Sequence, residues 1–255
     1  MSEAPPTLWR DLRRFTPARV ALGRAGAGGL PTAAHLAFQA DHAAARDAVH
    51  AALDVAALQA ALAAAGLAAR VVRSACPDRP TYLRRPDLGR RLDDADRAAL
   101  AAAPVPGKLV FVVCDGLSAL AVQRHAAPLL ARIVPALEPD GAIVIATQGR
   151  VALGDDVGEA LGASAVALLI GERPGLSTPD SLGLYLTWAP RVGRTDAERN
   201  CLSNIRPEGQ SIAAAAFKTA WLVGQMRARG LTGVGLKDEA PTLPDQDRFT
   251  SVLST

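Results

Sequence analysis

The sequence predicts an α/β protein with a Rossmann-like, mostly parallel sheet flanked by helices and with an N-terminal helical extension. Two observations support this prediction. Unbroken runs of Val, Ile and Leu alternate with helix-like segments between residues 108 and 188, as they do in parallel sheets that are covered on both faces. The chain has 255 residues, 49% of them apolar, which is enough for the core of one such domain.

We expect an N-terminal helical arm over residues 1–66, a Rossmann-like domain over 67–236 and a flexible tail over 237–255. The arm starts with one or two amphipathic turns at 8–15. A glycine-rich segment follows at 20–31. It favours a linker over a phosphate loop, because its glycines do not form G-x-G-x-x-G after a strand.

Two helices complete the arm. Pro31 suits the first turn of a helix, which we expect to continue to about Leu53. An Ala/Leu-rich stretch over 55–65 predicts a second helix that ends at Gly66. The next unusual segment, 77–100, combines prolines, arginines and aspartates, and we expect an extended piece there, followed by a helix.

Strands and helices alternate through the remaining domain. Apolar runs predict strands at 68–74, 108–116, 143–147, 165–170 and 182–188. Helical patterns predict helices at 117–137, within 149–164 after a short extended piece, and at 211–229. Ser211 suits the N-cap of the last helix and Gly230 its C-terminal end.

The composition argues against several classes of partner. The net charge of +3 is spread along the chain, so we expect no nucleic acid partner. No apolar run is long enough for a membrane span, and residues 1–15 lack the apolar core of a secretory signal. Cys76, Cys114 and Cys201 are odd in number and far apart, which argues against a disulfide framework and a zinc site. We expect a reduced, cytoplasmic protein.

Three loops follow buried strands and combine glycine with polar groups: 114–118, 149–151 and 171–175. In an open parallel sheet the ligand crevice lies at the carboxyl ends of the strands, so these loops are candidates for one binding surface. Ordinary loop chemistry explains each of them equally well, and the residues alone leave both interpretations open.

The usual catalytic sets are missing from the sequence. There is no G-x-S-x-G motif, and the histidines of the arm lack the H-E-x-x-H spacing of a metal site. Cys114, at a strand end, fits the core better than a nucleophile, because no base pairs with it in the sequence pattern. Asp115 fits a loop cap better than a general base. The polar segment 193–209 predicts either a capped helical turn starting at Thr195 or Asp196, or a ligand loop.

Several segments together resemble one family. They are "RVALGRAG", "YLRRPDLGRRL", "DGLSALAV", "IGERPGLSTPDSLGLYLTWAPR" and "DAERNCLSNIRPEG". In this order, over about residues 16–229, they resemble the small subunit of ethanolamine ammonia-lyase. The resemblance implies an adenosylcobalamin-dependent lyase that converts ethanolamine to acetaldehyde and ammonia. It also implies a large TIM-barrel subunit that carries the catalytic residues, and a complex of six large and six small subunits.

The resemblance further implies that the small subunit completes the cobalamin site at the subunit interface, so that 67–236 is a cobalamin-binding domain. Family contacts with the cofactor fall on Val151, Glu172 and Cys201. A cofactor with neutral amides and a nucleotide tail needs apolar area and scattered hydrogen-bond partners. The sequence lacks the Asp-x-His-x-x-Gly loop that supplies a cobalt ligand in other cobalamin proteins. We therefore expect no metal ligand in this chain. The resemblance, which assigns the catalytic residues to the large subunit, implies no catalytic residue here either.

Some assignments stay open at this stage. Arg173 could hold the Glu172 loop or face the partner subunit. The arginines of 84–91 could form a subunit interface, or Asp87 and Asp93 could hold them within the chain. The alternative function is a stand-alone Rossmann-type nucleotide-binding protein or enzyme, and a pure scaffold subunit is a third class. Residence in a bacterial microcompartment instead of the open cytoplasm is also undecided.

Overall fold

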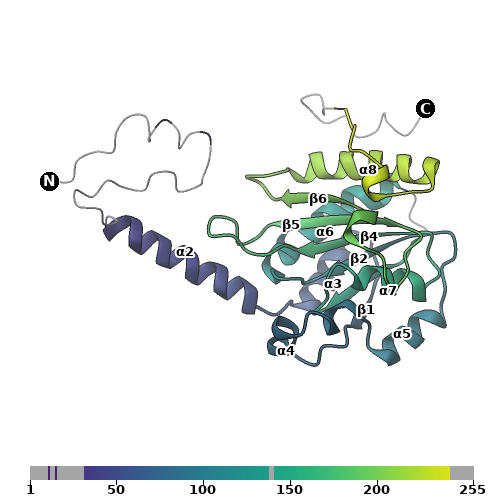
Figure 1. Ribbon diagram of the computed structural model, residues 1–255, viewed down its shortest axis with the longest axis horizontal. Helices are drawn as coiled ribbons and strands as arrows, with labels where there is room; N and C mark the ends of the chain where they lie inside the picture. Colours follow the sequence, from purple (N-terminus) through teal and green to yellow (C-terminus); the bar gives the residue numbers. More distant parts are fainter. Residues whose placement is uncertain (1–10, 12–14, 16–31, 138–140, 242–255) are drawn as a thin grey trace.

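The computed structural model describes residues 11, 15, 32–137 and 141–241, and the structural statements below concern those residues (Figure 1). Most of the expected turns at 8–15, and all of the glycine-rich segment at 20–31, lie outside the described residues. The same holds for the expected tail beyond residue 241.

A six-stranded sheet forms the middle of the molecule, in the order β1-β3-β2-β4-β5-β6. The strands are β1 (Ala69–Arg73), β2 (Leu109–Cys114), β3 (Ile143–Thr147), β4 (Ala165–Gly171), β5 (Leu182–Trp188) and β6 (Arg199–Ile205). The first four strands in this order pair in parallel, whereas β5 is antiparallel to β4 and β6 is antiparallel to β5. The prediction of a mostly parallel sheet is therefore confirmed.

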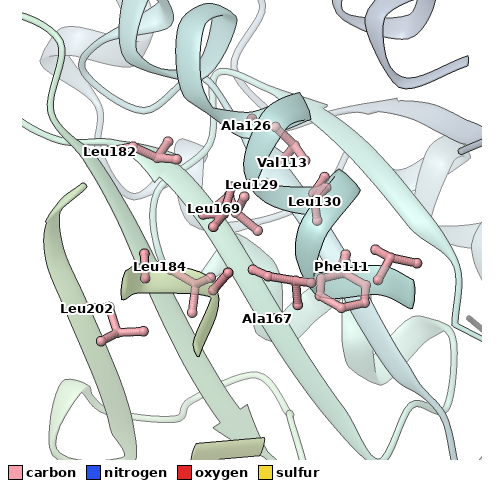
Figure 2. Close-up of a cluster of buried hydrophobic side chains, with 14 of the residues drawn as sticks. Phe111, Val113, Ala126, Leu129, Leu130, Ala167, Leu169, Leu182, Leu184 and Leu202 are labelled. Atoms are coloured by element: carbon pink, nitrogen blue, oxygen red, sulfur yellow. The ribbon is translucent and has the colours of Figure 1, made fainter. Parts of the chain in front are cut away.

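Helices cover both faces of the sheet (Figure 1). The α-helices of the described residues are α2 (Thr32–His50), α3 (Val55–Ala64), α4 (Arg79–Arg84), α5 (Asp94–Ala101), α6 (Ala119–Ala136), α7 (Leu153–Ala160) and α8 (Ile212–Arg229). α3, α6 and α8 pack on one face, and α5 and α7 pack on the other. Figure 2 shows part of the first layer, where Phe111 and Leu169 of the sheet lie near Leu129 and Leu130 of α6.

Capping side chains begin the two longest helices of the domain. The Ser211 hydroxyl accepts a hydrogen bond from the backbone N–H of Ala214, and Gly230 ends α8 with φ 64°, in the left-handed region. Both predicted ends of this helix are confirmed. Ser118 caps α6 in the same way, by accepting from the N–H of Ala121. These bonds satisfy backbone groups that have no partner inside the helix.

The segment 77–100 begins with a helix, so the expected extended piece is wrong. Asp78 caps α4 by accepting from the N–H of Thr81 at 2.7 Å. Pro80 lies in the first turn, where its missing N–H removes no helical hydrogen bond. The short extended piece expected before α7 is also wrong, because residues 151–152 form a turn.

The segment 193–209 contains a strand that the sequence did not predict. The expected capped turn is present as the 3-10 helix η3 (Asp196–Glu198), where Thr195 and Glu198 form a capping box. The chain then forms β6, which pairs with β5. A buried ion pair between Arg199 and Asp155, 2.7 Å long, fastens the start of β6 to α7. Cys201 therefore lies on a strand, not in a helical turn or a loop.

Helix α2 extends away from the sheet and its covering helices (Figure 1). Within α2 only Ala48 is buried, and Leu36 and Phe38 are exposed. Its last turn is held to the domain because Arg79 Nε donates to the carbonyl oxygen of Val49 at 2.9 Å. In the described part of the chain no single helix is long and apolar enough to cross a membrane; α2 and α3 pass this test only as a pair, with an 83° bend between them.

Candidate functional site

An open pocket of about 440 Å³ lies at the carboxyl edge of the parallel strands. All three loops predicted from the sequence contribute to its lining: Gly116 and Leu117 after β2, Arg150 and Val151 after β3, and Gly171, Glu172 and Arg173 at the end of β4. The expectation that these loops share one surface is confirmed. The physical reason is that the carboxyl ends of parallel neighbours meet at the same edge of a sheet.

The antiparallel strands also reach this pocket. β6 is antiparallel to β5, which is antiparallel to β4, so β6 runs in the same direction as β4. The carboxyl end of β6 therefore returns to the pocket edge, where Ser203 lines the wall. Tyr185 of β5 lines the same wall.

Two glycines let the loops after β2 and β4 come into backbone contact. A Cβ on Gly171 would lie 2.0 Å from the carbonyl oxygen of Ser118, and one on Gly116 would lie 2.3 Å from the carbonyl oxygen of Gly171. The N–H of Leu117 donates to Gly171 O at 2.9 Å. Gly171 thus permits a close approach between the end of β4 and the loop after β2.

Glu172 is anchored by three hydrogen-bond donors. Its carboxylate accepts from the hydroxyls of Ser181 and Ser203 and, at 3.1 Å, from the N–H of Asn204. These bonds tie the end of β4 to the start of β5 and to the end of β6. A carboxylate has about four acceptor positions, so the anchored group retains capacity for one further donor.

The other two predicted site residues take different positions. Val151 is half-buried and lines the pocket beside Arg150. Cys201 is exposed and lies opposite Tyr185 in the β5–β6 pairing. It is two residues before Ser203 and does not line the pocket itself. The structure therefore brings Val151 and Glu172 together and places Cys201 next to the same wall.

A buried ion pair connects two of the loops that line the pocket. Arg79 Nη1 donates to Asp115 Oδ2 at 3.0 Å and to the carbonyl oxygen of Gly116 at 2.9 Å. Asp115 Oδ1 accepts from the N–H of Gly149 at 3.3 Å, so the pair connects the loops after β2 and β3. Burial raises the pKa of the Asp115 carboxyl, and the Arg79 charge opposes this rise. Asp115 is thus more than the loop cap expected from the sequence.

Tyr82, whose position the sequence pattern did not indicate, contacts two arginines through its ring. Its ring centroid is 4.8 Å from the guanidinium carbon of Arg79 and 4.3 Å from that of Arg150. Its hydroxyl donates to the carbonyl oxygen of Gly149 at 2.9 Å. The unusual composition of 77–100 was the available signal for this cluster, but it did not indicate contact with the strand-end loops.

The remaining titratable candidates lie in structural roles. Cys114 is fully buried, which raises the pKa of its thiol and confirms the expected core position. His125 is buried on α6, with Nε2 3.7 Å from Asp180. Among the described residues, no group of three or more His, Cys, Asp or Glu side chains has the arrangement of a metal site.

Together the fold and the pocket define a class of protein: a Rossmann-like α/β protein with an open pocket at the carboxyl edge of its sheet. The pocket combines the apolar side chains of Leu117, Val151 and Ile170 with a few hydrogen-bonding groups. This mixture suits a large ligand with both apolar surface and amide groups.

Comparison with known proteins then identifies the family. The family model for the ethanolamine ammonia-lyase light chain (EutC) matches residues 6–237. The chain is 58% identical over 247 residues to the ethanolamine ammonia-lyase small subunit of Azotobacter vinelandii, covering 94% of this chain and 91% of the relative. It is 58% identical over 241 residues to that of Bradyrhizobium diazoefficiens, covering 92% and 91%. It is 57% identical over 240 residues to that of Ralstonia nicotianae, covering 91% and 88%. The chain therefore belongs to the ethanolamine ammonia-lyase small-subunit family.

This family forms part of an adenosylcobalamin-dependent carbon–nitrogen lyase, and a small subunit implies a large one. The pocket residues fit such a cofactor in two respects. Glu172 retains acceptor capacity, and the Nε of Arg150 is buried without a hydrogen-bond partner among the described residues. Both groups suit a ligand that carries amide donors and an anionic group.

Proposed function

We propose that this chain forms one wall of the adenosylcobalamin site of ethanolamine ammonia-lyase and that the large subunit forms the other. The observation that carries the proposal is the convergence of three strand-end loops and β6 on one open pocket. Pockets of about 300–1,000 Å³ enclose drug-sized ligands. A pocket of about 440 Å³ can cover only part of a corrin with its nucleotide tail.

Val151, Glu172 and Cys201 are the proposed cofactor contacts. Val151 offers apolar area on the pocket wall. The Glu172 carboxylate, oriented by its three donors, accepts from an amide N–H of the corrin rim. The exposed Cys201 extends the contact surface along β6. These side chains bind and orient the cofactor and exclude water from it.

The chain is expected to contribute no catalytic residue and no cobalt ligand. When bound, adenosylcobalamin supplies the radical chemistry that converts ethanolamine to acetaldehyde and ammonia. The large TIM-barrel subunit holds the substrate and carries the catalytic residues. We further propose six large and six small subunits per complex and a cytoplasmic location, with a bacterial microcompartment as the alternative.

The arginines of 84–91 are proposed to face the large subunit. Asp87 pairs with Arg85 at 2.7 Å, so one of the four arginines is held within the chain. Asp93 instead caps α5 and lies 3.9 Å from Arg73. Arg90 and Arg91 are exposed and have no ion pair within the described part of the chain. Their guanidinium groups are thus available for carboxylates of a partner.

Co-expression with the large subunit tests the proposed function. Ethanolamine deamination should require both chains, and purified complex should bind adenosylcobalamin. Full activity of either chain alone would overturn the proposal.

Glu172→Ala tests the site within that complex. We expect about 10-fold weaker cofactor binding, because a charged acceptor is lost. The matched control is Glu239→Ala, whose side chain is exposed, and which should leave affinity unchanged. Equal affinities of the two variants would contradict the assignment of Glu172.

A further inference from the structure

The pocket contains two arginines that are not neutralised by a carboxylate. Arg150 and Arg173 both line it, and neither forms an ion pair within the described ranges. Glu172 is the one carboxylate among the lining residues, and its described partners are two hydroxyls and a backbone N–H. The pocket lining therefore carries an excess of positive charge that the described residues leave unpaired.

Arg150 is held in place before any ligand binds. Its backbone N–H donates to the carbonyl oxygen of Gly89 at 2.7 Å, and its guanidinium carbon lies 4.3 Å from the centroid of the Tyr82 ring. Nη2 makes only a long hydrogen bond, 3.4 Å, to the carbonyl oxygen of Tyr82. The ring contact and this one long hydrogen bond hold the guanidinium in place. Most of its N–H groups are left free to donate to a ligand.

One nitrogen of Arg150 is left without an acceptor. Nε is buried and has no hydrogen-bond partner in the described part of the structure. Burying a donor that has no acceptor is unfavourable, and a guanidinium presents Nε and a terminal nitrogen side by side to two oxygens of one anion. Arg150 lines the pocket as a cation without a carboxylate partner in the described part of the chain. An oxyanion is therefore favoured over a neutral amide as its ligand.

We infer that Arg150, with Arg173 at the pocket rim, binds the phosphodiester of the cofactor's nucleotide tail. This inference rests on the proposed function. The corrin rim carries neutral amides, which do not call for a cation, whereas the phosphodiester linkage of the nucleotide tail is anionic. Arginine is suited to phosphate because its fork matches two phosphate oxygens. Arg150 is thus a positioning contact for the tail and Glu172 one for the corrin rim.

The test compares two cofactors in the assembled complex of large and small subunits. One is adenosylcobalamin, and the other is adenosylcobinamide, which lacks the nucleotide and its phosphodiester. Equilibrium binding is measured by titration calorimetry or by the absorption change of the corrin. The variants are Arg150→Gln, Arg150→Lys and Arg173→Gln, with Arg229→Gln as the matched control. Arg229 is exposed in the last turn of α8 and outside the pocket lining.

We expect Arg150→Gln to weaken adenosylcobalamin binding about 10- to 100-fold, as for loss of a charge-assisted hydrogen bond. Its effect on adenosylcobinamide should be less than about 3-fold. Arg150→Lys should weaken binding less than Arg150→Gln, because the lysine ammonium keeps the positive charge but cannot bind two phosphate oxygens at once as a guanidinium does. Arg173→Gln should show a smaller loss, again for adenosylcobalamin only, and Arg229→Gln should show none.

Equal losses for the two cofactors would overturn the inference, because Arg150 would then support the pocket without contacting the tail. If Arg150→Gln does not assemble, Arg173→Gln decides, since its exposed side chain is not needed for folding; the absence of a loss specific to adenosylcobalamin then rejects the inference. Failure of the unaltered complex to bind either cofactor would instead reject the proposed function.

Discussion

The parallel part of the sheet and its antiparallel end build the pocket in different ways. β2, β3 and β4 contribute strand-end loops that are joined by backbone contacts, two crowded glycines and the buried Arg79–Asp115 pair. β5 and β6 contribute side chains of a partly exposed wall, including Tyr185, Ser203 and the neighbouring Cys201. We call the first part, the loops after β2, β3 and β4 with the Arg79–Asp115 pair, the floor of the pocket. Because its contacts are buried, changes there should cost stability. The second is a surface whose changes should mainly affect binding.

The largest effect is expected at the floor, from Arg79→Leu. It leaves the Asp115 carboxylate, 3% exposed, buried without its ion partner, which typically costs about 3–5 kcal/mol. Urea unfolding of the small subunit, followed by tryptophan fluorescence, measures the free energy of unfolding.

The matched control is Arg85→Leu. Arg85 also pairs with an aspartate at 2.7 Å, but both side chains are more than half exposed, so the loss of unfolding free energy should be much smaller than for Arg79→Leu. Similar losses for the two variants would contradict the special role of the floor pair.

The second effect tests the close approach of the floor loops. Gly171→Ala places a Cβ 2.0 Å from the carbonyl oxygen of Ser118, and overpacking of this kind typically costs about 1–3 kcal/mol. Gly224→Ala is the control, because a Cβ there meets no atom within 4 Å and Gly224 lies inside α8. It should stabilise the chain by about 0.5–1 kcal/mol. A neutral Gly171→Ala in thermal or urea unfolding would show that the two loops can separate.

A smaller effect is expected where the floor and the wall meet. Ser203→Ala removes one of the three donors to Glu172, with an expected loss of about 0.5–1.5 kcal/mol. Cofactor affinity should fall together with the unfolding free energy, because Glu172 is less well oriented without the Ser203 hydroxyl. Ser177→Ala, at an exposed position outside the pocket lining, serves as the control. Unchanged cofactor affinity of the assembled complex would show that Ser181 and the N–H of Asn204 are sufficient to orient Glu172.

The smallest effect on stability is expected from Cys201→Ala on the wall. Cys201 is exposed, so the change in unfolding free energy should remain within about 0.5 kcal/mol. Its thiol should react with a disulfide reagent before the buried thiols of Cys76 and Cys114. In the assembled, cofactor-bound complex the reaction of Cys201 should slow. Unchanged reactivity on assembly would place this part of the wall outside the interface.

The same contrast explains which elements could be predicted. In β2 and β4 every residue is buried, so their apolar runs identified them as strands. β6 alternates irregularly between buried and exposed positions and contains Arg, Asn and Ser. Its composition therefore resembled a loop. The direction of β5 was not readable either, because a buried antiparallel strand has the same apolar run as a parallel one.

The candidate site was predicted in outline for a similar reason. Glycine and polar residues after each buried strand identified all three loops, and these loops do line one pocket. The roles of Arg79, Tyr82 and Arg150 could not be predicted, because they depend on contacts between segments more than 30 residues apart in the chain. Local sequence carries no information about which distant groups meet.

The sequence by itself determined the α/β class, the ends of α8, the three pocket loops and the family, because these depend on local patterns and on extended similarity. Only the tertiary structure decided the direction of β5, the existence of β6, the anchoring of Glu172 and the position of Arg150. Those features arise from pairing and packing between distant segments. The burial of each group and its available partners are properties of the folded chain.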